Sequence, residues 1–396
     1  MATRRNVLKM VPLSLLSSQV AFPQTATVKP FKIAIPKPSV DRILARVREA
    51  NWPPKLDASD WRYGANFDYM RSLAEYWTIK FDWKKAEAKL NRYPQFLARV
   101  EDFDIHFYHV KGKGAKTLPV IFTHGWPGSV FEFQEAIAPL TEAGLDVVVP
   151  SLPGFGFSSK PQGKPVGPIT TARLWHKLMT QVLGYQKFGA QGGDWGNTVT
   201  VQLAREFPDS LVGIHLNAAG GAAPATGEVT EEVAAWQKAA VAYRVQEIDY
   251  FNIQQHKPQT VAFALSDSPL GFAAWVIEKF KVWSDSGTTD IEKAFTKDQL
   301  LTNVMIYLVT GTTTTGVWFY RGAGEETSTL RGKVTVPTGF ASFPAEMTIL
   351  NPPQSVLEAN FNLIQYAKMP RGGHFACLEQ PALFVEEVVK FFGRFK

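Results

Sequence analysis

The chain has 396 residues, 45% of them hydrophobic and 20% charged, which excludes a disordered chain, a collagen and a coiled coil. Its 42 basic and 36 acidic residues give a net charge of +6 with no basic block, so we expect no nucleic-acid partner. No run approaches the ~20 apolar residues of a transmembrane helix, and the single cysteine, Cys377, excludes a disulfide framework and a multi-cysteine zinc site.

Residues 1–26 resemble a bacterial twin-arginine export signal. Arg4 and Arg5 are followed by Leu8 and Lys9, and then by a short apolar stretch with serines over residues 11–22. No clean small-x-small cleavage pattern follows, and a frayed basic tail is the alternative. The segment predicts a periplasmic or secreted protein, and otherwise a cytoplasmic one.

Residues 27–100 have a mainly helical pattern and are expected to form an N-terminal helical lead-in domain. Apolar residues at helical spacing, from Val40 to Val47, follow Ser39 as the expected cap, and Trp52-Pro53-Pro54 ends this helix. Two more helices are expected over residues 67–79 and 83–90.

The pattern then changes to short strands that alternate with helices. Residues 103–108 alternate apolar and polar side chains, as in a half-buried strand. The apolar runs that follow are residues 120–123, 146–150, 188–191, 212–216, 334–337 and 363–367. A helix over 130–140 is expected to begin with a capping box of Ser129 and Glu132. Residues 101–219 and 331–396 are therefore predicted to form a doubly wound, mainly parallel α/β sheet.

Residues 220–330 interrupt this alternation with a mostly helical stretch. Thr296 and Gln299 form a second capping box, ahead of a helix over 297–309. A stretch of this length is too long for a loop. It predicts an inserted helical cap over the strand ends, where ligands of open α/β sheets bind.

Asp194 is the candidate nucleophile. It stands at the centre of Gly192-Gly193-Asp194-Trp195-Gly196, between the strand 188–191 and a helix expected over 198–207, the context of a nucleophile elbow. A carboxylate that displaces a leaving group from saturated carbon forms an alkyl ester that water can cleave afterwards. Asp at the elbow therefore favours epoxides or alkyl halides over esters as substrates.

The expected oxyanion hole consists of two backbone N–H groups, those of Trp126 and Trp195. Trp126 belongs to residues 124–128, His-Gly-Trp-Pro-Gly, directly after the strand 120–123. The imidazole of His124 is expected to hold this loop in place.

The candidate base is His374, in the glycine-hinged segment 371–375 after the strand 363–367. The acid that orients it should lie between nucleophile and base in the chain. Glu346 follows the strand 334–337 and fits this position, with Glu358 as the alternative. His106 and His109 are expected on opposite faces of one strand, so neither is expected to bind a metal.

Five segments in order resemble the microsomal-type epoxide hydrolases and their juvenile-hormone-hydrolysing relatives. They are HGWPGS (124–129), PSLPGFGFSSKP (150–161), GGDWG (192–196), GFASFPAE (339–346) and RGGHF (371–375). The resemblance runs from about Phe31 to Lys396 and implies the α/β-hydrolase fold. It implies Asp194 as nucleophile, His374 as base and Glu346 as its orienting acid. It also implies that two cap tyrosines, Tyr250 and Tyr320, bind the epoxide oxygen. The membrane-bound relatives have a longer apolar anchor than this chain.

The expected function is hydrolysis of small apolar epoxides to vicinal diols by water, without a metal or organic cofactor and without a transmembrane anchor. A homodimer is expected from the resemblance alone. Haloalkane dehalogenase is one alternative, but it has no use for two cap hydroxyls. A non-catalytic binding protein with the hydrolase fold is the other, and the ordered triad argues against it.

Overall fold

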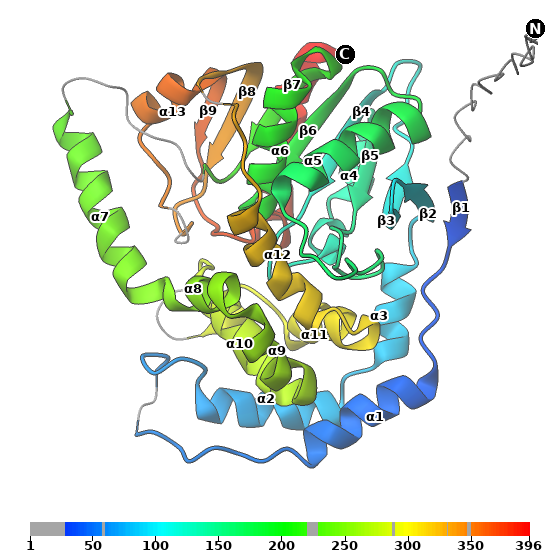
Figure 1. Ribbon diagram of the computed structural model, residues 1–396, viewed down its shortest axis with the longest axis vertical. Coiled ribbons are helices and arrows are strands. Elements are labelled where there is room, and N and C mark those ends of the chain that lie inside the picture. Colours follow the sequence, from blue (N-terminus) through cyan, green and yellow to red (C-terminus); the bar gives the residue numbers. More distant parts are fainter. Residues whose placement is uncertain (1–27, 58–59, 220–228, 287–289, 331, 347–349) are drawn as a thin grey trace, which may run out of the picture.

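The computed structural model describes residues 28–57, 60–219, 229–286, 290–330, 332–346 and 350–396. A nine-stranded sheet with the order β1-β2-β3-β5-β4-β6-β7-β8-β9 runs through this part of the chain (Figure 1). The strands are β1 (Val28–Phe31), β2 (Gln95–Val100), β3 (Phe103–Val110), β4 (Leu118–Thr123), β5 (Leu145–Pro150), β6 (Phe188–Gly192), β7 (Leu211–Leu216), β8 (Val334–Ser342) and β9 (Phe361–Lys368).

The sheet is parallel from β5 through β4, β6, β7 and β8 to β9, and antiparallel at the edge formed by β1, β2 and β3. Strands β4, β5 and β6 are buried along their whole length because helices cover both faces. A strand buried on both faces has a continuous apolar sequence rather than an alternating one. The predicted doubly wound, mainly parallel sheet is confirmed.

Two layers of helices cover the sheet. Side chains of α5 (Pro168–Lys177) and α6 (Asp194–Glu206) share one core cluster with Val148 of β5. Side chains of α4 (Ile137–Glu142) and α15 (Pro381–Phe392) share another with Val147. Successive residues of one strand thus point to opposite cores, as the pleat requires. The short helices α13 (Gln354–Asn360) and α14 (Ala376–Glu379) lie near the chain end.

The N-terminal region differs from the helical expectation at both of its ends. β1 and β2 lie in it, and they pair antiparallel with each other and then with β3. Polar residues interrupt the apolar pattern of β2, so pairing with β3 rather than local sequence decides its conformation. Helices α2 (Phe67–Ile79) and α3 (Trp83–Leu90) have the expected limits. Helix α1 (Lys37–Arg48) has Pro36 rather than the expected Ser39 as its N-cap, and Pro38 lies in its first turn, where proline is tolerated.

The helix expected over residues 130–140 is divided in two. A 3₁₀ helix, η1 (Val130–Phe133), is followed by α4, which begins at Ile137. The hydroxyl of Ser129 accepts from the N–H of Phe131 and donates to Asn303, 174 positions later in the chain. The N–H of Glu132, which the predicted capping box would direct to the Ser129 hydroxyl, donates instead to the Ser129 carbonyl within the 3₁₀ turn.

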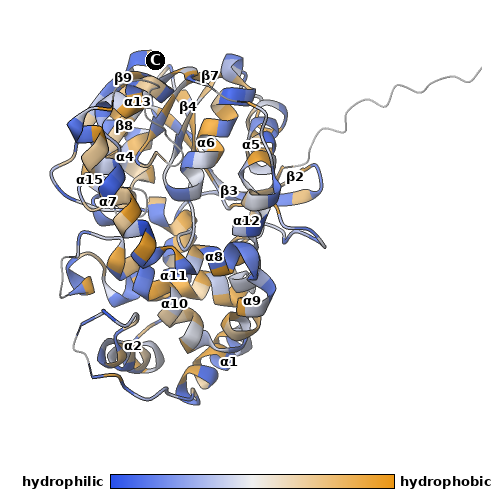
Figure 2. Ribbon diagram, turned by 60° about the vertical axis from the view of Figure 1, so that its left-hand side comes forward, coloured by the Kyte–Doolittle hydropathy of each residue, from blue (hydrophilic) through white to orange (hydrophobic). Residues whose placement is uncertain are grey.

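The helices between β7 and β8 form what we call the cap. They are α7 (Glu231–Glu247), α8 (Asp249–His256), α9 (Pro258–Asp267), α10 (Pro269–Val282), α11 (Lys297–Thr310) and α12 (Thr313–Glu325). The capping box of Thr296 and Gln299 is confirmed at the start of α11. Figure 2 shows the sheet at one end of the molecule, α1 and α2 at the other, and α8 to α11 between them. The N-terminal helices therefore support the cap, with α1 against α10 and α2 against α11.

Among the residues described, no single helix is long and apolar enough to cross a membrane. The consecutive helices α9 and α10 meet the length and composition criteria only as a pair, and this pair is bent by 116°.

Candidate active site

Asp194 stands on a strained turn between β6 and α6. Its φ of +48° lies in the left-handed region that residues with a side chain seldom adopt. Glycines surround it because a Cβ at Gly192 would overlap the Gly196 carbonyl, and one at Gly196 would overlap the Thr123 carbonyl. Helix α6 begins at Asp194, four residues before the expected start. The carboxylate is thus at a helix N-terminus, where the backbone dipoles favour negative charge.

His374 contacts two carboxylates from different parts of the chain. Its Nε2 is 3.2 Å from Asp194 Oδ2, and its Nδ1 is 2.8 Å from Glu346 Oε2. The loops after β8 and β9 hold Glu346 and His374, and a parallel bridge between Ala345 and Gly373 joins these loops. The alternative acid, Glu358, is exposed on α13 and accepts a hydrogen bond from Gln354. The structure therefore brings Glu346, and not Glu358, to the histidine.

The pKa of His374 is governed by these neighbours. Burial by itself lowers the pKa of this imidazole, but the charges of Glu346 and Asp194 and their hydrogen bonds outweigh it and hold the pKa well above 6.5. In the free enzyme His374 is therefore an imidazolium between two carboxylates, donating from Nδ1 to Glu346 and from Nε2 to Asp194.

The expected oxyanion hole is partly visible in the hydrogen bonds. The Trp126 N–H donates to Asp194 Oδ1 at 2.8 Å. The Trp195 N–H lies in the first turn of α6, where backbone N–H groups have no acceptor within the helix. His124 holds the Trp126 loop, since its Nδ1–H donates to the Gly125 carbonyl and its Nε2 accepts from the Leu152 N–H. Burial lowers the pKa of His124 to about 4, so this imidazole is neutral.

Tyr250 on α8 and Tyr320 on α12 lie side by side above the elbow. Their ring centroids are 6.0 Å apart at 81°, Trp126 stacks on Tyr250 at 5.7 Å, and Trp195 meets Tyr320 edge-on at 4.9 Å. Burial raises the pKa of both tyrosines well above 10, and the charge of Asp194 raises it further. The neighbouring Tyr320 hydroxyl offsets part of this rise for Tyr250. Both side chains are therefore neutral donors.

Three polar residues near the site are not identified by the sequence patterns. The Lys279 ammonium lies 4.6 Å from the ring centroid of Tyr250 and 2.7 Å from Glu278, and nothing in the pattern of α10 distinguishes it. Gln191, at the end of β6, and Glu132, in η1, line a cavity beside Asp194. The spacing of Glu132 from Ser129 predicts a capping residue, and that role accounts for its place in the sequence without a second one.

The structure gives no indication of a metal site in the part of the chain it describes, where no group of three His, Cys, Asp or Glu residues could hold an ion. His106 contacts the Ser151 hydroxyl, and His109 contacts the hydroxyl of Tyr185.

A nucleophile elbow, a histidine with its acid, and the backbone N–H of Trp126 meet at the carboxyl ends of a doubly wound sheet, beneath a helical cap. This combination defines an enzyme of the α/β-hydrolase class. Asp at the elbow separates it from the esterases and lipases, which use Ser there.

Comparison with known proteins identifies the family. A family model described as "Epoxide hydrolase N terminus" matches residues 28–133, and one described as "alpha/beta hydrolase fold" matches residues 119–278. Epoxide hydrolase 1 of Oryctolagus cuniculus is 37% identical over 93% of this chain and 89% of its own length.

Two solved structures are also similar. The juvenile hormone epoxide hydrolase of Bombyx mori has a TM-score of 0.85 at 29% identity, covering 94% of this chain and 95% of its own. Aspergillus niger epoxide hydrolase has a TM-score of 0.83 at 28% identity, covering 94% and 98%. The chain belongs to the epoxide hydrolase family.

Proposed function

We propose that this enzyme converts epoxides to vicinal diols in two steps, through an ester on Asp194. The observation that carries this proposal is the contact of an elbow Asp with His374, beneath two neutral tyrosine hydroxyls from the cap. The aromatic rings around these hydroxyls favour a small apolar epoxide as substrate. A homodimer is a further proposal, which rests on the family resemblance and which sedimentation velocity would test.

In the first step a carboxylate oxygen of Asp194 attacks one carbon of the epoxide. A carbon–oxygen bond to Asp194 forms while the ring carbon–oxygen bond breaks. The oxygen that leaves accumulates negative charge, which Tyr250 and Tyr320 meet by hydrogen bonding, and one of them gives up its proton. Their raised pKa keeps both hydroxyls protonated before the substrate arrives.

Formation of the ester changes the protonation of His374. Asp194 loses its charge, so two of the causes that raise the pKa of the imidazole disappear, while burial continues to lower it. The imidazolium then releases a proton, which restores the tyrosine. Neutral His374, still oriented by Glu346, is now able to act as a base.

In the second step His374 removes a proton from water, whose oxygen bonds to the Asp194 carbonyl carbon. The resulting oxyanion is stabilised by the Trp126 and Trp195 N–H groups. The bond between this carbon and the substrate oxygen then breaks, and the diol leaves with the proton from His374. The proton of the new carboxylic acid returns to His374, so the initial state is restored.

Oxygen transfer offers a direct test of this proposal. Because water attacks the carbonyl carbon, a single turnover in water labelled with heavy oxygen should place the label in Asp194 and leave the diol unlabelled. Mass spectrometry of the peptide that contains Asp194 measures this. Label in the diol alone would show direct attack by water on the epoxide, and chloride release from a chloroalkane without diol from styrene oxide would favour a dehalogenase.

The two steps should depend differently on pH. Hydrolysis needs neutral His374. At pH values below the pKa that His374 has in the ester form of the enzyme, the rate of hydrolysis should therefore fall about tenfold per pH unit. Alkylation proceeds with His374 protonated and should stay flat over the same range. Rapid-quench measurements of each step, from mildly acidic to mildly alkaline pH, would separate them. A parallel fall of both rates would contradict the assignment of His374 to the second step alone.

We further propose that the chain is exported. Residues 1–26 lie outside the described residues, and the proposal rests on Arg4, Arg5 and the apolar stretch after them. Replacement of both arginines by Lys should leave the protein at full mass in the cytoplasm, because a twin-arginine signal requires the pair. Cell fractionation measures this, with Arg42→Lys on the exposed face of α1 as control. The same distribution for wild type and double variant would refute export by this route.

A further inference from the structure

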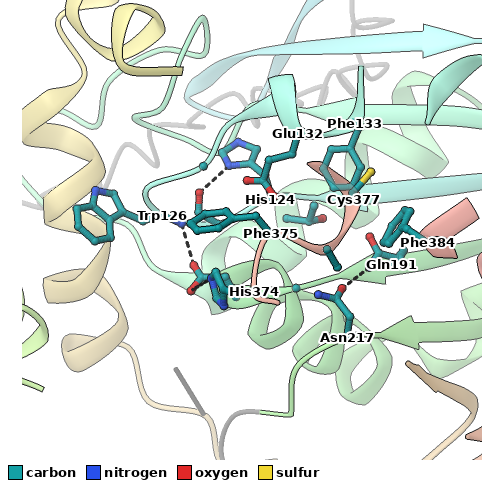
Figure 3. A pocket seen from close by; sticks show the side chains of 16 residues that line it. His124, Trp126, Glu132, Phe133, Gln191, Asn217, His374, Phe375, Cys377 and Phe384 are labelled. Atoms are coloured by element: carbon teal, nitrogen blue, oxygen red, sulfur yellow. Dashed lines mark hydrogen bonds and ion pairs between the residues drawn. The ribbon is translucent and has the colours of Figure 1, made fainter. Parts of the chain in front are cut away.

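A small cavity lies beside Asp194 and His374, lined by residues at the ends of β4 and β6 and in the segments after β4, β7 and β9. Its volume is about 20 Å³, and its polar lining includes Asp194, His374, Glu132, Gln191 and Asn217. Neither Tyr250 nor Tyr320 lines it. A water molecule needs about 10–15 Å³ of such volume, so the cavity accommodates one water and is too small for an epoxide. Figure 3 shows the labelled side chains around it.

Gln191 presents an unused acceptor in the core beside this cavity. Its Nε2 donates to Asn217 Oδ1 at 2.8 Å, which orients the amide. Its Oε1 is buried and has no donor among the protein groups that the structure describes. Buried acceptors without a donor are rare and unfavourable in native proteins. A water in the cavity would supply the missing donor.

The carboxyl group of Glu132 is placed in the cavity by the backbone of its own loop. It occupies the space that a Cβ at Gly128 would need, and the Ser129 backbone lies close enough to offset part of the rise in its pKa. Burial raises the pKa of Glu132 to about 8. The negative charge of Asp194 contributes to this rise, and the positive charge of His374 opposes it. At neutral pH the group is therefore a carboxylic acid, which can both donate and accept a hydrogen bond.

We propose that this cavity holds the water that cleaves the ester, and that Glu132 and Gln191 are positioning residues that orient it toward Asp194 and His374. The inference rests on the two-step mechanism proposed above. In this step the water's proton passes to His374 Nε2 and its oxygen bonds to the Asp194 carbonyl carbon. Water then approaches from the side of the sheet while the alkyl group points toward the cap, so hydrolysis does not require the alkyl group to move away first.

The test compares two substitutions of Glu132. Glu132→Leu keeps the approximate size and removes the polar atoms, so the water loses its orientation. Hydrolysis should slow by about 10- to 100-fold, the usual cost of misplacing a reacting group, while alkylation keeps its wild-type rate. Glu132→Gln should stay within a few-fold of wild type, because a neutral amide also donates and accepts. Rapid quench followed by mass spectrometry of the Asp194 ester measures both steps.

Two further variants separate positioning from a general structural effect. Gln191→Leu should slow the same step, because it removes the second contact to the water. Glu135→Gln is the matched control, since Glu135 follows in the same segment but is exposed and paired with Lys89 at 2.7 Å. This control should hydrolyse the ester at the wild-type rate. If Glu132→Leu fails to fold, the hydrolysis rates of Gln191→Leu and Glu132→Gln are compared instead. Slow hydrolysis in Gln191→Leu with a near-wild-type rate in Glu132→Gln supports the inference, and a wild-type rate in Gln191→Leu overturns it.

The outcomes distinguish the inference from the mechanism beneath it. Ester that accumulates in Glu132→Leu, with alkylation unchanged, supports the inference. If Glu132→Leu hydrolyses the ester at the wild-type rate, or loses as much alkylation as hydrolysis, the inference about Glu132 is overturned. The two-step mechanism still stands in that case, provided that the ester accumulates on His374→Gln. Absence of ester on His374→Gln as well would overturn both.

Discussion

Replacement of His374 by Gln is expected to stop turnover and leave the substrate attached to Asp194. A Gln side chain fits the space beside Glu346, but it cannot take a proton from water. General-base assistance is typically worth about 10²–10⁴ in rate, so hydrolysis should fall by this factor while one equivalent of ester still forms. Intact-protein mass spectrometry after incubation with an epoxide should show the added mass of the substrate, and peptide mapping should place it on Asp194.

His256→Gln is a suitable control for this experiment. His256 is exposed at the end of α8, so the substitution removes an imidazole from the cap without touching the site. It should turn over like wild type and carry no mass at steady state. Unmodified His374→Gln after exposure to a good substrate, or undiminished turnover in that variant, would contradict the role of His374.

Loss of both cap tyrosines is expected to abolish ring opening. The oxygen leaves the epoxide as an alkoxide, a poor leaving group, and only donors at this position reduce its charge. Each substitution to Phe should cost roughly 1–3 kcal/mol of transition-state stabilisation, the scale of one hydrogen bond to a charged group. Tyr250→Phe or Tyr320→Phe alone should therefore keep partial activity, and the double variant should lack detectable alkylation.

Tryptophan fluorescence during a single turnover can locate this loss, because Trp126 and Trp195 contact the tyrosine rings. The alkylation phase should slow, whereas the hydrolysis phase of any ester that forms should keep its rate. Tyr63→Phe, at an exposed position before α2, serves as the control. Alkylation by the double variant at the wild-type rate would show that the tyrosines have another task.

Much of the site could be predicted because its chemistry lies in short motifs after strands. Asp194, the Trp126 loop and the His374 loop each follow an apolar run and contain glycine, and parallel strands bring their carboxyl ends to one edge. Tyr250 and Tyr320 carried no such local signal, and only the family resemblance selected them. Their pKa also depends on burial beneath the cap, so the ordinary phenol value near 10 does not apply to the folded enzyme.

The sequence by itself determined the alternation of strands and helices from β3 onward, the elbow, and the capping box at Thr296, because these depend on local patterns of neighbouring residues. The local pattern allowed Glu346 and Glu358, since both follow the nucleophile and precede the base, and the family resemblance implied Glu346; the tertiary structure shows its contact with His374. It also decided the pairing of β1 and β2 and the break after η1, where the partner of Ser129 is Asn303. Glu132 shows most clearly why the sequence alone is not enough. Its position three residues after Ser129 fits a helix cap, whereas its place beside His374 depends on segments more than 200 positions apart in the chain.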